Sequence, residues 1–406
     1  MGTRTNMRTP SSILSTTTTH SRYRQLLVVT LLVTASPAIA QDVEPPDRFQ
    51  FTADLGHTRD SNYDREPGND PENINTGTAG IRINQTLSRQ NFNARAAVTR
   101  NEFDEREELD TTTWSGGAGW RGAIGNRIKP YLSWGYSEDL VDRAEFEGKD
   151  VLTNEVFRGG LVYALGPHWN IPIRAQRVDQ EHSNDSQTSL DYIEDQISVG
   201  LLYTSDRYST AGLNLISGQR EYPNQNQSRP DDIPADEDLD YDYTTVELES
   251  TWVVSPKTQL EGRVGFFDRD GEANDGSGGY ALVEGRWKPT YKTKLTTGVQ
   301  YTEPPIGERS NSPSEIERIY LDAEWQATTK ILLSAGYSWS NNNYDANASR
   351  ESRTEELQVI NPLIARYQMT DALEIYFRST WVDRSSPVDD REFDATIVKL
   401  GLNLTL

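Results

Sequence analysis

The sequence has no cysteine, only four histidines and, after residue 40, no apolar run long enough to cross a membrane as a helix. Without cysteine, a disulfide framework, a thiolate metal site and lipoprotein acylation are all excluded. A spanning helix is excluded because it needs roughly 20 consecutive apolar residues. The hydrophobic fraction of 35% is also low for a globular chain of this size. Two classes remain, a disordered secreted chain and a β-barrel whose strands are apolar on one face only.

The first 40 residues differ in composition from the rest. They hold four arginines and no acid, then an apolar run at 26–33, then a small-residue stretch that ends at Ala38-Ile39-Ala40. These parts predict a signal peptide over 1–40, cleaved before Gln41 to leave a mature chain of 41–406. Removing its four positive charges from the net charge of −22 leaves −26. So acidic a chain is a poor partner for nucleic acid, whose binding needs a positive surface.

Apolar and polar residues alternate from Arg48 to Leu406, which argues against disorder. In the last segment, one face carries Thr396, Val398, Leu400, Leu402, Leu404 and Leu406, and the other carries Lys399, Gly401, Asn403 and Thr405. Successive side chains of a strand point to opposite faces, so this pattern predicts strands that are apolar on one face. The same alternation recurs near 49–56, 79–84, 197–203, 260–266, 294–301 and 373–378.

Short and long polar connections also alternate along the chain. Eight short links lie near 89–91, 123–127, 166–168, 205–207, 255–257, 290–292, 328–330 and 370–372. Nine longer, acid-rich links lie near 58–76, 104–109, 139–152, 181–188, 221–240, 269–278, 303–314, 341–353 and 384–391. Outer-membrane barrels have an even strand number, short periplasmic turns and long extracellular loops. The sequence therefore predicts an all-β fold, a transmembrane antiparallel up-and-down β-barrel of about 18 strands, with 16 as the alternative.

Aromatic residues on the apolar faces gather near predicted strand ends. They are Trp114, Trp120, Trp134, Tyr136, Trp252, Trp287, Trp325, Tyr337, Trp339 and Trp381. Amphipathic rings prefer the headgroup level of a membrane, where they form the aromatic girdles of such barrels. The alternative is a soluble β-sandwich or solenoid whose aromatic residues fill a core.

Three prolines, Pro130, Pro172 and Pro362, lie inside predicted strands. A closed barrel has no edge strand that could accommodate a residue without a backbone N–H. Each proline is therefore expected near a strand end or a β-bulge.

If the apolar face meets lipid, the opposite face lines the barrel, and it is charged in both signs. The basic candidates are Arg82, Arg95, Arg121, Lys129, Arg158, Arg174, Arg263, Arg286, Arg366, Arg378 and Lys399. The acidic candidates are Glu247, Glu249, Glu261, Glu284, Asp322, Glu324 and Glu374, and the tyrosines Tyr131, Tyr320 and Tyr376 share their parity. Such charges either select solutes in an aqueous pore or form ion pairs that stabilise the wall. The tyrosines either contact sugar rings or act as spacers.

No catalytic, cofactor or metal site is predicted. The histidines of the mature chain, His57, His168 and His182, fall near strand ends or in a turn, and nothing places a nucleophile beside them. The acid run 231–238 has the oxygen ligands that calcium prefers, but it lacks the glycine and closing glutamate of an EF-hand loop. Acid-rich loops are usually solvated, so we do not expect an enzyme.

The segment 55–63, Leu-Gly-His-Thr-Arg-Asp-Ser-Asn-Tyr, resembles the opening of the outer-membrane β-barrel porin 2 family, which includes the EpsL-like porins of exopolysaccharide operons. The chain length and the single barrel agree with that family over the mature chain. Leu406 departs from it, because phenylalanine is common at this position. The resemblance implies a passive channel that exports a polysaccharide across the outer membrane of a Gram-negative bacterium. It also implies a periplasmic polysaccharide-export protein as a partner.

Three functions are therefore considered. The first is a conduit for exopolysaccharide or capsular polysaccharide export. The alternatives are a general small-solute diffusion porin and a structural or adhesive barrel without transport. In each case the expected partners are outer-membrane lipid, lipopolysaccharide and the barrel-assembly machinery.

Overall fold

Residues 48–68, 70–143, 148–227, 237–307, 313–345 and 352–406 are described by the computed structural model. Their strands are β1 (Arg48–Asp60), β2 (Glu72–Leu87), β3 (Gln90–Phe103), β4 (Thr111–Gly122), β5 (Ile128–Leu140), β6 (Val151–Ala164), β7 (Trp169–His182), β8 (Tyr192–Thr204), β9 (Thr210–Glu221), β10 (Tyr241–Ser255), β11 (Thr258–Gly271), β12 (Gly276–Trp287), β13 (Thr293–Thr302), β14 (Glu315–Gln326), β15 (Ile331–Tyr344), β16 (Arg353–Gln368), β17 (Leu373–Ser385) and β18 (Phe393–Thr405). Three short 3₁₀ turns, Glu107–Leu109, Thr188–Leu190 and Asp389–Arg391, lie in the long links. Among these residues, no helix has the length and apolar character needed to cross a membrane.

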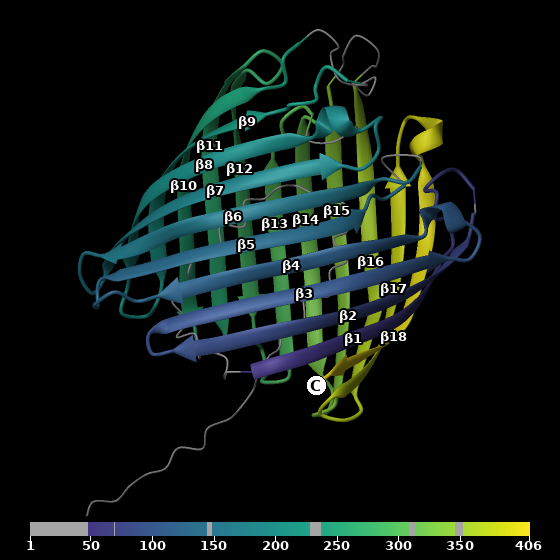
Figure 1. Ribbon diagram of the computed structural model, residues 1–406, viewed down its shortest axis with the longest axis horizontal. Coiled ribbons are helices and arrows are strands. Elements are labelled where there is room, and N and C mark those ends of the chain that lie inside the picture. Colours follow the sequence, from purple (N-terminus) through teal and green to yellow (C-terminus); the bar gives the residue numbers. More distant parts are fainter. Residues whose placement is uncertain (1–47, 69, 144–147, 228–236, 308–312, 346–351) are drawn as a thin grey trace, which may run out of the picture. The chain divides into compact units, whose positions relative to one another are not determined.

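The 18 strands form one closed antiparallel barrel (Figure 1). Each strand pairs with its neighbours in the chain, and β1 closes the sheet by pairing with both β2 and β18. Leu55, for example, lies opposite Leu402 on β18 and Gly77 on β2. Closure leaves no sheet edge exposed, so every strand has a partner on both sides. The predicted fold class and the strand number of 18 are confirmed, and the alternative of 16 strands is wrong.

The links alternate as predicted, with both ends of the sheet on the side of the short links. The described barrel begins at Arg48 and its last strand ends at Thr405. Two predicted long links are wrong in their extent, because the flanking strands extend into them: 58–76 shortens to 61–71, and 269–278 shortens to 272–275. The predicted signal peptide lies outside the described residues and stays a prediction.

The three prolines lie where a closed sheet tolerates them. Pro130 is the third residue of β5, and Pro172 is the fourth residue of β7. Pro362 lies at a register shift between Ile360 and Leu363 in the pairing of β16 with β17. A β-bulge leaves one residue without a ladder partner, so the missing N–H of Pro362 costs no ladder hydrogen bond. The expectation for these prolines is confirmed.

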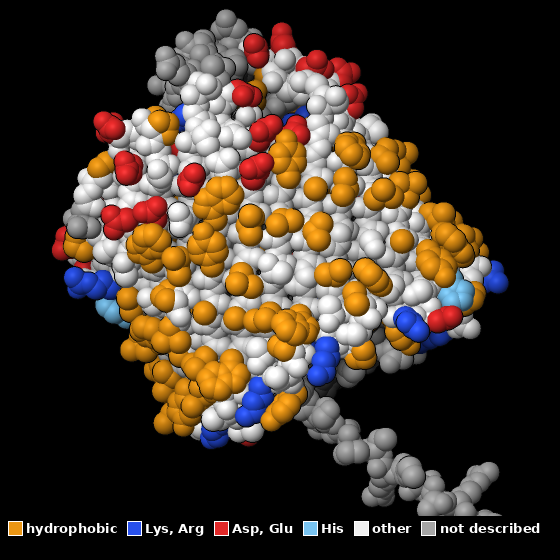
Figure 2. Space-filling view, turned by 180° about the vertical axis from the view of Figure 1, so that it is seen from behind, with side chains coloured by type: hydrophobic (Ala, Val, Ile, Leu, Met, Phe, Trp, Pro, Cys, Tyr) orange, Lys and Arg blue, Asp and Glu red, His pale blue; other side chains and the backbone are white. Residues whose placement is uncertain are grey.

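The outer face of the barrel carries large apolar side chains that are exposed in the isolated chain. Phe266 is 68% exposed, and Leu55 and Trp252 are similarly uncovered. Figure 2 shows these side chains as a band between an end rich in acids and an end where lysines and arginines lie. An apolar belt of this kind on a closed sheet is the surface that meets lipid. The predicted girdle aromatics lie on this same face by register.

Candidate functional site on the inner face

The strand register places every predicted inward residue on one face of the sheet. Glu247, for example, lies opposite Gly265, which in turn lies opposite Tyr280. Side chains of this face meet over an intervening strand, as when the hydroxyl of Tyr376 on β17 donates to Asp54 on β1 at 2.9 Å. The face is therefore the concave interior of the barrel, opposite the exposed apolar face.

Cations dominate the inner face from β2 to β7. In chain order they are Arg82, Arg95, Arg121, Lys129, Arg158 and Arg174. Arg95, Arg121, Lys129 and Arg158 are exposed although they point inward, so water reaches the interior beside them. Within these six strands, all of which the structure describes, the inward acids are confined to two positions near the long links, Glu72 and Asp139. We call this surface the cation wall.

The cation wall includes an electrostatically unfavourable pairing. Arg82 on β2 lies directly opposite Arg95 on β3, and like charges in that position destabilise a sheet. Further along the wall, Arg158 is oriented by its neighbour, because its Nε donates to the Oε1 of Gln176 at 2.6 Å. These side chains create a positive potential inside a chain whose net charge is −22.

Charges on the inner face from β10 to β14 are arranged differently, because acids and bases there form ion pairs within and between strands. Arg286 contacts Glu261 at 2.8 Å and Glu284 at 2.7 Å. Lys294 contacts Glu324 at 3.1 Å. Strands nine places apart lie opposite each other in an 18-stranded barrel, so β12 faces β3 across the interior. We call this surface the paired wall.

Glu247 is the most enclosed charge of the paired wall, with 2% of its surface exposed. Its Oε1 accepts a hydrogen bond from Asn214 at 3.1 Å, and its Oε2 accepts one from the Tyr280 hydroxyl at 2.7 Å. The guanidinium of Arg263 lies 3.4 Å from the same Oε2. A buried carboxylate is tolerated only with such a complete set of partners.

Inward tyrosines brace the wall by a repeated arrangement. Tyr320 lies opposite Gly298, where an added Cβ would come within 2.4 Å of its ring, and its hydroxyl donates to Glu284 on the strand beyond at 2.5 Å. The other tyrosine–glycine–acid sets are Tyr243 with Gly218 and Glu194, Tyr280 with Gly265 and Glu247, and Tyr376 with Gly401 and Asp54. Tyr131 lies opposite Gly160, which in turn lies opposite Arg174 on the next strand. These contacts favour the interpretation of the tyrosines as spacers over that of sugar contacts.

Sequence reasoning missed several inward residues of these networks. They are Asp54, Glu194, Asn214, Arg220, Tyr243, Tyr280, Lys294 and Arg318. Tyr243, Tyr280 and Arg318 have the parity of inward residues predicted on their own strands, so a stricter application of the two-residue period would have found them. Their partners depend on strand register, which the period alone does not give.

The described parts of the links at the long-loop end include a polar cluster and an apolar cluster. The polar cluster joins the links 61–71, 104–110 and 141–150 through arginines, with Arg106 bound to Asp64 and Glu72 and Arg143 bound to Asp64 at 2.9 Å. Burial disfavours ionisation of Asp64, but the hydrogen bond from Arg106 and the charge of Arg143 outweigh it and lower its pKa.

The apolar cluster lies over the ends of β6 to β11. Its buried members are Val178, Leu190, Tyr192, Tyr222, Leu239 and Tyr241. Burial raises the pKa of Asp191 and Asp240, two acids of the links in this cluster, despite backbone hydrogen bonds from His182 and Tyr222. The two clusters thus hold their acids in opposite electrostatic environments.

The histidines show no catalytic arrangement in the part of the chain that the structure describes. His57 points outward and contacts Asn75 at 2.9 Å, and His168 lies in a short link. His182 contacts Asp150 at 2.6 Å and so ties the links 141–150 and 183–191 together. The acid run 231–238, whose carboxylates could suit calcium, lies outside the described residues except for Glu237 and Asp238. Among the described residues, no cluster of three acids or histidines suited to a metal ion is present.

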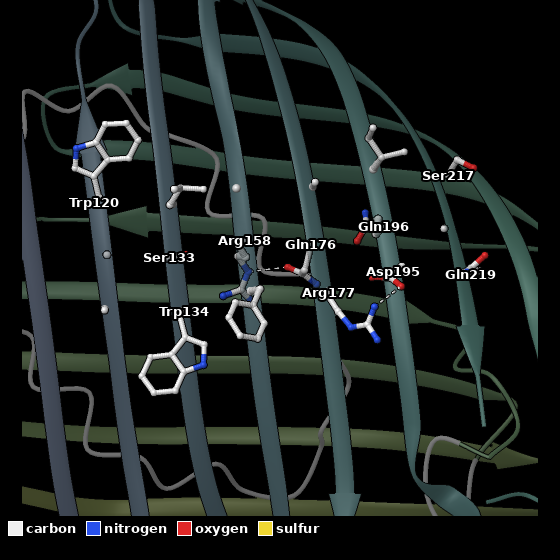
Figure 3. Close-up of a pocket in the computed structure, with 18 of the residues that line it drawn as sticks. Trp120, Ser133, Trp134, Arg158, Gln176, Arg177, Asp195, Gln196, Ser217 and Gln219 are labelled. Carbon is white, nitrogen blue, oxygen red and sulfur yellow. Dashed lines mark hydrogen bonds and ion pairs between the residues drawn. The ribbon is translucent and has the colours of Figure 1, made fainter. Parts of the chain in front are cut away.

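A groove of about 1430 Å³ crosses the outer surface from β2 to β11 (Figure 3). It lies between two outward rows of side chains, and its floor is the backbone of the inward row that includes Ser133, Arg158 and Gln176. Small residues such as Ala118 and Ala175 leave it unfilled. The groove therefore belongs to the outer surface, and the inner face is the candidate functional site.

Comparisons with known proteins agree with this architecture. Residues 27–204 match a family model described as outer membrane protein beta-barrel domain. No curated protein matches the sequence. Solved structures with a similar fold include Pseudomonas aeruginosa OccK2 (OpdF), at 13% identity and a TM-score of 0.50 over 89% of this chain and 98% of that one. Another is Pseudomonas aeruginosa OpdK with vanillate, at 11% identity and a TM-score of 0.50 over 88% and 99%. The fold is that of an outer-membrane β-barrel.

Proposed function

We propose that the chain is an outer-membrane channel for small polar solutes and that it favours anions. The observation that carries the proposal is the cation wall, where Arg95, Arg121, Lys129 and Arg158 project into water-accessible space on four adjacent strands. A barrel of 18 strands is wide enough for an aqueous channel. A single-signed wall opposite a balanced one gives a potential that attracts anions and repels cations.

The single sign of the cation wall supports a role in transport. Arg82 lies directly opposite Arg95, whereas the paired wall places acids beside its bases. The OpdK structure of similar fold was solved with vanillate, a small aromatic carboxylate. That solute has the charge and size that we propose for this channel.

The small-solute alternative is better supported than polysaccharide export. The family model and the structures of similar fold describe outer-membrane barrels, and none of them supports the export function that the resemblance to EpsL-like porins implies. Two of the predicted inward tyrosines, Tyr320 and Tyr376, could have lined a sugar path, but they donate their hydroxyls to the wall carboxylates of Glu284 and Asp54.

Uptake into proteoliposomes tests the proposal. Vesicles that contain the purified barrel should take up labelled glutamate several-fold faster than labelled lysine, which has a similar size and the opposite charge. Entrapped dextran should stay inside. If neither amino acid enters, the barrel is sealed and structural. If dextran is released, the result favours polysaccharide export.

A further inference from the structure

The two ends of the barrel carry opposite charge. The nine long links contain 29 acids and eight bases, whereas the eight short links contain seven bases and two acids. The bases of the short links are Arg89, Arg127, Arg207, Lys257, Lys288, Lys292 and Lys330. In Figure 2, lysines and arginines accordingly lie at the end opposite the acids. Short links of an outer-membrane barrel lie on the periplasmic side, beside the inner leaflet. We call this ring of short links the basic rim.

Lysines of the basic rim are held in place by the neighbouring links. The ammonium groups of Lys257, Lys292 and Lys330 each donate to a backbone carbonyl of the next short link, at 3.3, 3.4 and 3.1 Å. An ammonium group has three donors, so each lysine keeps donors for a further ligand. The rim thus presents positioned cations with remaining hydrogen-bonding capacity.

Exposed apolar side chains accompany these cations. Tyr291 is 92% exposed, Tyr208 63% and Ile124 58%, and Leu165 and Met369 are also exposed. They belong to five different short links that are distributed around the circumference. A protein partner would cover one contiguous patch, whereas a lipid leaflet surrounds the whole barrel. Apolar tips beside basic groups are the combination that inserts into a headgroup layer.

We infer that the basic rim binds anionic phospholipid headgroups of the inner leaflet. The phosphate would lie against lysine or arginine, and the exposed apolar residues would reach into the start of the acyl region. One basic residue at a negatively charged membrane surface corresponds to a preference of about fivefold for the anionic lipid. This inference concerns anchoring, and it stands whether or not the interior conducts solutes.

Tryptophan quenching by brominated lipids tests the inference, because Trp169, Trp287 and Trp325 lie at or near the short links. Full-length barrel is reconstituted in mixtures of brominated phosphatidylglycerol or brominated phosphatidylcholine with the unlabelled lipid. The relative binding constant for phosphatidylglycerol should be about five and should fall toward one in 1 M salt. The variant R207Q/K257Q/K292Q/K330Q removes four of the seven rim bases and should lower the ratio at low salt.

Two further variants control for charge and for folding. R95Q/R121Q/K129Q/R158Q removes the same charge from the cation wall and should keep the wild-type ratio. K257R/K292R/K330R keeps the rim charge and should also keep it. A wild-type ratio of one, or an unchanged ratio in the neutralised rim variant, overturns the inference. Rim-dependent cosedimentation with peptidoglycan, together with an unchanged lipid ratio, would overturn it in favour of a cell-wall contact.

Discussion

The cation wall and the paired wall use inner-face charge in opposite ways. On the cation wall, Arg95, Arg121 and Lys129 are exposed and of one sign. On the paired wall, Glu247 is almost fully enclosed by partners from neighbouring strands. An inward charge is therefore not by itself evidence of transport. The two walls differ in the sign balance of their charges and in how far those charges are exposed, and that difference predicts which substitutions alter selectivity and which alter stability.

Neutralising the cation wall should have the largest effect. In R95Q/R121Q/K129Q/R158Q, the preference for glutamate over lysine should fall from several-fold to about one, because the single-signed potential is removed. Exposed charges contribute little to folding, so the free energy of unfolding should change by less than about 1 kcal/mol. Proteoliposome uptake and urea unfolding in lipid vesicles measure the two quantities. The matched control K294Q/E324Q removes one ion pair of the paired wall and should leave the preference for glutamate intact. Loss of that preference in the control would contradict the distinction between the two walls.

Removing the Glu247 carboxylate should have the largest effect on stability. Glu247→Ala leaves Arg263, Tyr280 and Asn214 without their shared acceptor in a buried site. Loss of one partner from a buried charge network costs about 3–5 kcal/mol, which urea unfolding would detect. Glu324→Gln, at a half-exposed position, should cost about 1 kcal/mol or less. Equal losses in the two variants would show that the paired wall is not held by its buried pairs.

Substituting glycines should reveal a smaller difference in stability between the two walls. At Gly298 an added Cβ would come within 2.4 Å of the Tyr320 ring, whereas at Gly135, on the cation wall, it would meet nothing within 4 Å. Overpacking of this kind costs about 1–3 kcal/mol, so Gly298→Ala should be destabilised relative to wild type. Gly135→Ala should unfold at the same urea concentration as wild type. Similar behaviour of both variants would mean that the tyrosine braces are not tightly packed.

Lowering the pH should change the stability of the polar cluster and of the apolar cluster in opposite directions. The pKa of Asp64 is lowered, so its ionised form stabilises the polar cluster at neutral pH, and this contribution is lost as the pH falls below about 4. The pKa values of Asp191 and Asp240 are raised, so their protonation just above that pH stabilises the apolar cluster. Hydrogen exchange of each link, compared with Asp64→Asn or Asp191→Asn at the same pH, isolates these effects. A change of the same sign in both clusters would contradict the assignment.

Much of the fold follows from local pattern, and much of the site does not. The two-residue period and the alternating link lengths predicted 18 strands, and parity placed Arg95 and Glu247 on the same face. Parity could not tell that Glu247 has three partners, because those partners come from β9, β11 and β12 through the register. The link at 272–275 was predicted as 269–278 because the segment is polar and acid-rich, although 269–271 belong to β11 and 276–278 belong to β12.

The central claim is that the interior is an open channel whose cation wall favours anions. Its most direct test is the reversal potential of single wild-type channels in a planar bilayer under a potassium chloride gradient. The account predicts a steady conductance and a reversal potential of the sign expected for chloride selectivity. A barrel that does not conduct, or one whose reversal potential shows a preference for potassium, would contradict it.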